Sequence, residues 1–169
     1  LTLSPNNPII WNELAQLYAI DYHDDVKFQE TITKSLQVDE GFEQTWMLLG
    51  DMRSNKGDLA GAVAAYRKSL EIRDNCTVRR VLGTLQAQQT QWAEAAATLE
   101  EAINRCAQAS DLWEMYRVLA ITYANLGRGQ DALQMATLAL EAAPEAQKPA
   151  IQQIVDQLKP VEVTPTPQP

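Results

Sequence analysis

The chain has 169 residues, of which 46% are hydrophobic, and a net charge of −8 from 14 basic and 22 acidic side chains. This length allows a buried core, and the acidic balance argues against nucleic-acid binding, which needs Lys and Arg to neutralise phosphates. No run of about 18 apolar residues is present, so no membrane-spanning segment is predicted. Glycine and proline are few before the last ten residues. Because strong helix formers dominate the rest, we predict an all-α chain.

Apolar periodicity and turn residues predict helices in chain order. Asn7 and Pro8 suit an N-cap and a first helical residue, and Gly57 and Gly127 stand where helices must stop. The last predicted helix has an apolar face backed by glutamines, as the end of a stack requires, and residues 160–169 are predicted to form an extended, proline-rich tail. The expected helices span 8–22, 25–38, 42–55, 58–72, 76–89, 91–105, 111–126, 129–142 and 146–158.

A pattern of large and small residues recurs about every 34 residues. It starts with an aromatic residue followed by Leu-Ala or Leu-Gly, and a second half carries alanines at helical spacing. The copies are carried by Trp11, Leu14, Ala15 and Tyr18; by Trp46, Leu49, Gly50, Ala62 and Tyr66; by Leu82, Gly83, Ala95 and Leu99; and by Tyr116, Leu119, Ala120, Tyr123, Ala132, Ala136 and Pro144. This pattern resembles the tetratricopeptide repeat, Trp-x2-Leu-Gly-x2-Tyr followed by Ala-x3-Phe and Pro.

The resemblance implies a right-handed α-α superhelix, that is, a tetratricopeptide repeat (TPR) solenoid of about four helix-turn-helix repeats with a C-terminal capping helix. Some positions depart from the pattern, since Arg53, Arg79 and Gln86 replace expected aromatic residues. Residues 1–7 are expected to be the remnant of a preceding repeat, so the chain is expected to be cut from something longer. The expected repeats span about 8–40, 43–75, 76–109 and 111–144, followed by a capping helix at 145–159 and the tail.

In this family the first helix of each pair lines a concave groove. Amide-rich positions there suit an extended peptide, because Asn and Gln both donate to and accept from its backbone. The repeat register places twelve residues in the groove: Asn12, Gln16, Ile20, Met47, Asp51, Asn55, Arg80, Thr84, Gln88, Arg117, Ile121 and Asn125. Arg80 and Arg117 occupy equivalent positions and are predicted to form a basic ridge, unless each merely pairs with a neighbouring acid.

The predicted function is therefore a non-catalytic protein-protein interaction module that binds a peptide or partner protein of unknown identity. The clamp that some family members use for chaperone tails is absent, because Thr77 and Val81 stand where a Lys–Arg pair belongs. Two alternatives remain open. One is the soluble C-terminal region of a membrane glycan enzyme of the O-antigen ligase or polymerase type, and the other is a self-assembling scaffold. A cytoplasmic location is favoured, although the parent protein could be membrane-anchored.

Neither catalysis nor a cofactor is indicated by the remaining polar residues. His23 lies among aspartates, and an exposed helix–helix turn explains it better than a general base or cation site. Cys76 and Cys106 with one histidine are too few ligands for a usual metal site. Free cysteine behaves as a small hydrophobe, so two unbridged thiols are the favoured interpretation. A disulfide is the alternative, because antiparallel pairing would bring these helix ends together.

Overall fold

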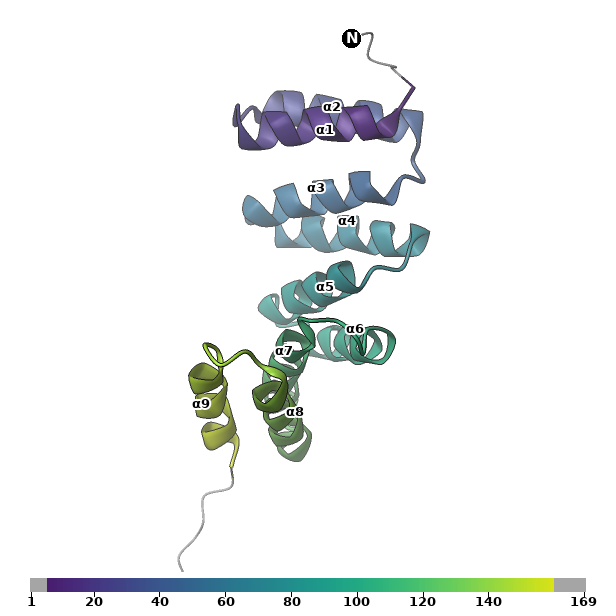
Figure 1. Cartoon of the computed structure of the whole chain (residues 1–169). Coiled ribbons are helices and arrows are strands. Elements are labelled where there is room, and N and C mark those ends of the chain that lie inside the picture. Colours follow the sequence, from purple (N-terminus) through teal and green to yellow (C-terminus); the bar gives the residue numbers. More distant parts are fainter. Residues whose placement is uncertain (1–5, 160–169) are drawn as a thin grey trace, which may run out of the picture. The chain divides into compact units, whose positions relative to one another are not determined.

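The computed structural model describes residues 6–159, and all the regular secondary structure in this range is helical. The predicted tail and most of the predicted repeat remnant lie outside it. Every predicted helix is present, with ends within two residues of the prediction (Figure 1). The helices are α1 (Pro8–Ile20), α2 (Asp25–Val38), α3 (Glu43–Asn55), α4 (Leu59–Ile72), α5 (Cys76–Gln88), α6 (Trp92–Arg105), α7 (Leu112–Asn125), α8 (Gly129–Ala142) and α9 (Lys148–Leu158).

The helix ends follow the capping residues of the sequence. The Asn7 side chain accepts a hydrogen bond from the Ile9 backbone N–H at 3.0 Å, and Pro8 occupies the first turn of α1, where its missing N–H costs nothing. Gly57 and Gly127 follow α3 and α7 with φ angles of +79° and +74°, which glycine adopts without the penalty of a Cβ. These local signals explain why the helix boundaries were predictable.

The described residues form two compact units, which divide after residue 89, so that the first spans 6–89 and the second 90–159. In the first, which we call unit 1, α1 pairs with α2 and α3 with α4, and α5 packs against α4. Its core combines small, aliphatic and aromatic residues from successive helix pairs, as stacked helical hairpins require. One cluster comprises Ala15, Phe28, Ile32, Leu49 and Ala65, and another comprises Ala62, Val63, Tyr66, Val78, Leu82 and Leu85.

The α3–α4 pair shows why the repeat pattern alternates small and large residues. A Cβ added to Gly50 would lie 2.7 Å from a ring atom of Tyr66, closer than real Cβ contacts. Glycine at this position therefore lets the Tyr66 ring lie directly against the backbone of α3. Ala62, on the same helix as Tyr66, has no exposed surface.

In the second unit, which we call unit 2, α7 pairs with α8, α6 packs against α7, and α9 packs against α8. The last helix buries Ile151 and Val155 against alanines of the preceding helices, including Ala136 and Ala139. The one-sided apolar pattern of this helix correctly predicted a buried face, and its role as a capping helix stays a prediction. None of the helices within residues 6–159 combines the length and apolar content needed to cross a bilayer.

The favoured expectation of two free thiols is wrong, because Cys76 and Cys106 are both disulfide-bonded in the structure. Cys76 is the first residue of α5, and Cys106 directly follows α6. Both cysteines therefore stand at helix ends, rather than in a helix interior where a free cysteine packs as a small apolar residue.

Candidate interaction groove

Unit 1 contains two neighbouring hollows, which share the residues Gln16, Leu48 and Asp51. We call the two together the unit-1 groove. The first hollow, of about 480 Å³, is lined by Gln16, Ala19, Ile20, Leu48, Asp51, Met52, Ser54, Asn55 and Tyr66. The second, of about 370 Å³, is lined by Gln16, Glu43, Gln44, Met47, Leu48, Asp51, Arg73 and Asn75.

Helical spacing brings the lining side chains together. Gln16 and Ile20 are four residues apart on α1, and Leu48, Asp51 and Asn55 follow one another at intervals of three and four on α3. Residues at these intervals share one face of a helix. Because α1 and α3 pack against each other, their two faces form adjoining walls of one groove.

A buried tyrosine holds the acidic residue at the centre of this groove. The Tyr66 hydroxyl donates a hydrogen bond to Oδ1 of Asp51 at 2.5 Å. Tyr66 is only 3% exposed, whereas Asp51 lies on the surface. Burial, followed by the hydrogen bond to Asp51, raises the pKa of the Tyr66 phenol far above its usual value. The phenol therefore stays protonated and remains a donor at neutral pH.

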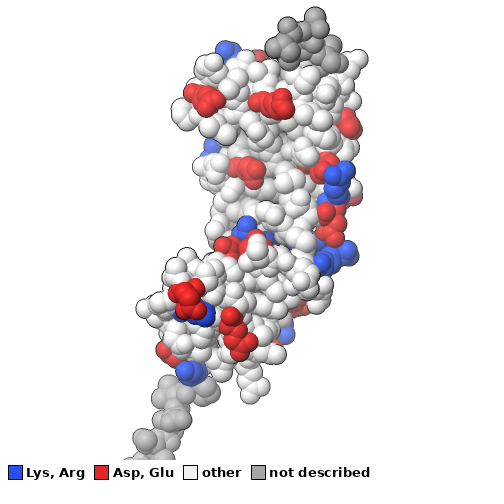
Figure 2. All heavy atoms as spheres, in the orientation of Figure 1, with Lys and Arg blue, Asp and Glu red and all other residues white. Residues whose placement is uncertain are grey.

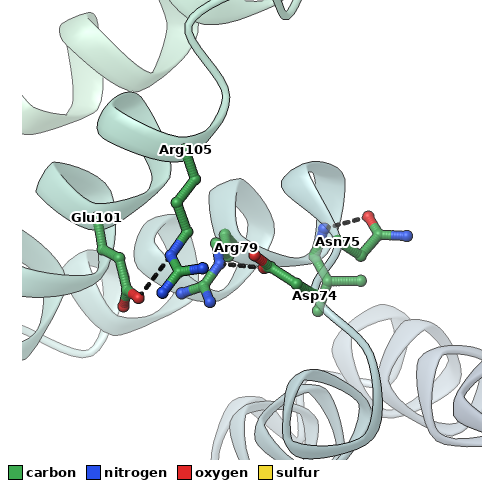
Figure 3. A network of polar contacts seen from close by, with 6 residues as sticks. Asp74, Asn75, Arg79, Glu101 and Arg105 are labelled. Atoms are coloured by element: carbon green, nitrogen blue, oxygen red, sulfur yellow. Dashed lines mark hydrogen bonds and ion pairs between the residues drawn. The ribbon is translucent and has the colours of Figure 1, made fainter.

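The other charged groups of the groove form an ion pair. Arg73 Nη1 lies 2.9 Å from Glu43 Oε1, and the arginine side chain is 69% exposed while the glutamate is 8% exposed. The α4–α5 loop that carries Arg73 is held by Arg79, which donates to the Asp74 carboxylate (Figure 3). The next residue, Asn75, caps α5 by accepting the Val78 N–H at 3.1 Å.

Five of the residues that the repeat register placed in the groove line one or both hollows: Gln16, Ile20, Met47, Asp51 and Asn55. Asn12 does not. It is 6% exposed, and its side-chain oxygen accepts hydrogen bonds from the hydroxyls of Ser35 and Thr45, both at 3.0 Å. Asn12 is therefore a member of a buried polar cluster between helices, and its orientation was predicted wrongly.

The predicted positions on α5 lie outside the lining of both hollows. Thr84 donates its hydroxyl to the Arg80 carbonyl at 2.9 Å, as serine and threonine often do inside helices. Arg80 is half-buried and already takes part in an interaction within the folded chain, while Gln88 is exposed. Arg80 belongs to unit 1 and Arg117 to unit 2, so the proposed basic ridge stays a prediction.

The remaining predicted residues lie on α7 in unit 2. Arg117 and Ile121 are half-buried, and the exposed Asn125 donates its amide to the Ile121 carbonyl at 2.8 Å. Tyr123 is also on α7, and its hydroxyl donates a hydrogen bond to Oε1 of Glu100 on α6 at 2.7 Å. Burial and this hydrogen bond raise the pKa of Tyr123 to about 12. The Arg128 guanidinium lies 3.9 Å from the Tyr123 ring centre.

Sequence reasoning missed several lining residues: Leu48, Gln44, Glu43, Tyr66, Arg73 and Asn75. The repeat register considered only regularly spaced positions on the first helix of each pair. Tyr66 belongs to α4, and Arg73 and Asn75 lie in the loop before α5. The pairing of Gly50 with the aromatic Tyr66 in the repeat pattern is the one signal that could have placed this tyrosine beside α3.

Two other places offer less to a ligand. A larger hollow of about 610 Å³ lies on α2, but all its lining residues come from that single helix, so no second element can hold a ligand from the opposite side. His23 is exposed in the turn after α1, with a φ of +50°. Within the part of the chain that the structure describes, no three His, Cys, Asp or Glu residues gather as a metal site requires.

Comparison with known proteins agrees with the repeat pattern. Residues 43–76, which form α3, α4 and the loop to α5, match the family model described as tetratricopeptide repeat. This is the second of the four repeats that the sequence predicts. No curated protein matches this sequence.

Solved structures with the same fold share little sequence with this chain. YrrB, described as a TPR protein with an unusual peptide-binding site, has a TM-score of 0.73 at 16% identity, covering 94% of this chain and 90% of its own. PilF of Pseudomonas aeruginosa has a TM-score of 0.72 at 16% identity, covering 89% of this chain and 67% of its own. PilW, described as a type IV pilus biogenesis factor, has a TM-score of 0.68 at 18% identity, covering 89% of this chain and 70% of its own. The predicted TPR-solenoid fold class is therefore confirmed.

Proposed function

We propose that this TPR-fold chain is a non-catalytic protein-interaction module that holds an extended segment of a partner protein in the unit-1 groove. The fold is typical of interaction modules, which supports the general class of function. The observation that carries the specific proposal is the pair of joined hollows, which share Gln16, Leu48 and Asp51. Together they are lined by residues of α1, α3, α4 and the α4–α5 loop.

The chemistry of the lining suits a peptide backbone. Exposed amide side chains of Gln16, Gln44 and Asn55 alternate with the half-buried apolar residues Leu48 and Met47. An amide can donate to a peptide carbonyl and accept from a peptide N–H, so it recognises an extended backbone whatever its side chains. The apolar positions between the amides then offer contact area to the partner's side chains.

The experiment compares two tryptophan substitutions on one helix. Gln16→Trp places a large ring where the two hollows meet, whereas Glu13→Trp adds the same ring to an exposed position of α1 outside both. Each variant is used to capture proteins from the source cell by crosslinking, next to the unchanged chain. We expect Gln16→Trp alone to lose the captured partner, with helical content unchanged in both variants. Equal capture by all three proteins would refute the groove as the binding site.

The disulfide state of the cysteines bears on the compartment. Disulfides persist in oxidising environments and are rare in the cytosol. Since Cys76 and Cys106 are both disulfide-bonded, we propose an oxidising compartment for this region in place of the cytoplasmic location that the sequence favoured. The glycan-enzyme and scaffold alternatives have no specific observation in their favour.

A further inference from the structure

The charges of the unit-1 groove do not balance within the described residues. Glu43 is neutralised by Arg73 through the 2.9 Å ion pair. Asp51, which both hollows share, has the Tyr66 hydroxyl as its polar partner, and this hydroxyl is neutral. No ion pair in the described part of the chain involves Asp51. One carboxylate charge therefore faces the groove without a cation beside it.

The position of this carboxylate is set by the packing of α3 against α4. Gly50 admits the Tyr66 ring against the helix backbone, and the ring in turn holds Oδ1 of the adjacent Asp51. A side chain that is oriented before binding loses little rotational freedom when a partner docks. The second carboxylate oxygen remains available for a charge-assisted hydrogen bond, which is stronger than a bond between neutral groups.

An apolar surface lies next to the carboxylate. Ile20 is 67% exposed although its side chain is large and apolar, and Ala19, Leu48 and Met52 line the same hollow and are half-buried. Covering such a side chain is favourable in proportion to the apolar area removed from water. The groove thus offers an apolar contact and an anionic contact side by side.

We infer that the unit-1 groove selects an extended peptide segment that carries a lysine or arginine beside an apolar side chain. The basic group pairs with Asp51, the apolar group covers Ile20 and Leu48, and amides bind the backbone between them. The Asn75 oxygen is used in capping α5, so its amide nitrogen, which points away from that helix in Figure 3, is left to donate. This inference rests on the proposed function and names the partner's chemistry.

The surrounding surface agrees with a basic partner. Figure 2 shows acidic side chains over α1 and α3 on one face of unit 1, with basic ones at the edges and, beside acidic ones, on the part of the face below α3. The chain as a whole carries a net charge of −8. Such a surface attracts a basic segment and repels an acidic one, which adds to the preference set by Asp51.

The test measures the binding of short synthetic peptides by fluorescence anisotropy. All probes have one apolar residue next to a variable residue, which is lysine, its uncharged analogue norleucine, or glutamate. We expect the lysine peptide to bind about two- to fivefold more tightly than the norleucine peptide, as one exposed ion pair predicts, and the glutamate peptide to bind most weakly. The lysine advantage should shrink as salt is raised from about 0.05 to 0.5 M.

Asp51→Asn removes the charge but keeps an oxygen that can accept from Tyr66, so the groove retains its shape. We expect this variant to bind the lysine and norleucine peptides equally. The matched control is Glu13→Gln, which makes the same charge change on α1 outside both hollows and should keep the lysine preference. Ile20→Ala should weaken the binding of all three peptides to the same extent, since all three carry the same apolar residue.

Three results would overturn the inference: equal binding of the three peptides, a lysine preference that survives Asp51→Asn, or no binding of any peptide at millimolar concentration. The proposed function is judged separately, by the loss of cellular partner capture in Gln16→Trp. If Gln16→Trp loses the partner while Asp51→Asn retains it at every salt concentration, the groove is a binding site but the basic-residue preference is wrong.

Discussion

Replacing Gly50 with alanine provides a direct test of the packing that holds the groove together. The new methyl group would lie 2.7 to 2.9 Å from three ring atoms of Tyr66. The ring has little freedom to withdraw, because Tyr66 is 3% exposed in the core and its hydroxyl is bonded to Asp51. Either the ring or the α3 backbone must shift, and a shift of the ring would also release the carboxylate.

Two opposing terms set the size of the effect. Alanine is favoured over glycine inside a helix by about 1 kcal/mol. Overpacking a well-filled core costs about 1–3 kcal/mol, and the upper end applies here because the ring is held at both ends. We therefore expect Gly50→Ala to lower the free energy of unfolding by about 2 kcal/mol. In a Tyr66→Leu background the clash is absent, and the same alanine should stabilise by about 1 kcal/mol.

The assay is urea unfolding followed by circular dichroism, arranged as a double-mutant cycle between the two positions. Gly129→Ala is the control, because Gly129 is also helical but a Cβ there meets nothing within 4 Å. It should be neutral or slightly stabilising in both backgrounds. A Gly50→Ala variant at least as stable as the unchanged chain, or an equal effect with and without the tyrosine ring, would refute the close-contact argument.

The other predictions concern separate parts of the chain. Ala62→Leu should cost about 1–3 kcal/mol in urea unfolding, since Ala62 has no exposed surface; melting like the parent would contradict the repeat register. Because the folded-state pKa of Tyr123 is raised to about 12, its contribution to stability is complete below the ordinary tyrosine pKa of about 10 and is lost as pH rises from there toward 12. Tyr123→Phe should flatten the decline in unfolding free energy over that range. Thiol titration of the unfolded protein without reductant should find no free cysteine, and two free thiols would contradict the disulfide state.

The sequence by itself determined the helices and the repeat that organises them. Helix ends depend on local chemistry, so the cap at Asn7 and the turns at Gly57 and Gly127 could be recognised without knowing what surrounds them. The repeat period then predicted that Gln16 and Asp51 face a common groove, and both line the unit-1 hollows. Such a prediction is possible because residues three and four apart share a face wherever the helix packs.

Only the tertiary structure decided which polar side chains form hydrogen bonds inside the fold and which face outward. Asn12 and Gln16 are one helical turn apart and chemically similar, yet the hydroxyls of Ser35 and Thr45 bind the first and leave the second exposed. The bond between Tyr66 and Asp51 likewise joins α4 to α3, and burial around it controls the tyrosine pKa. Periodicity specifies the direction of a side chain around its own helix, whereas hydrogen-bond partners and charge balance depend on distances between helices, which no local pattern contains.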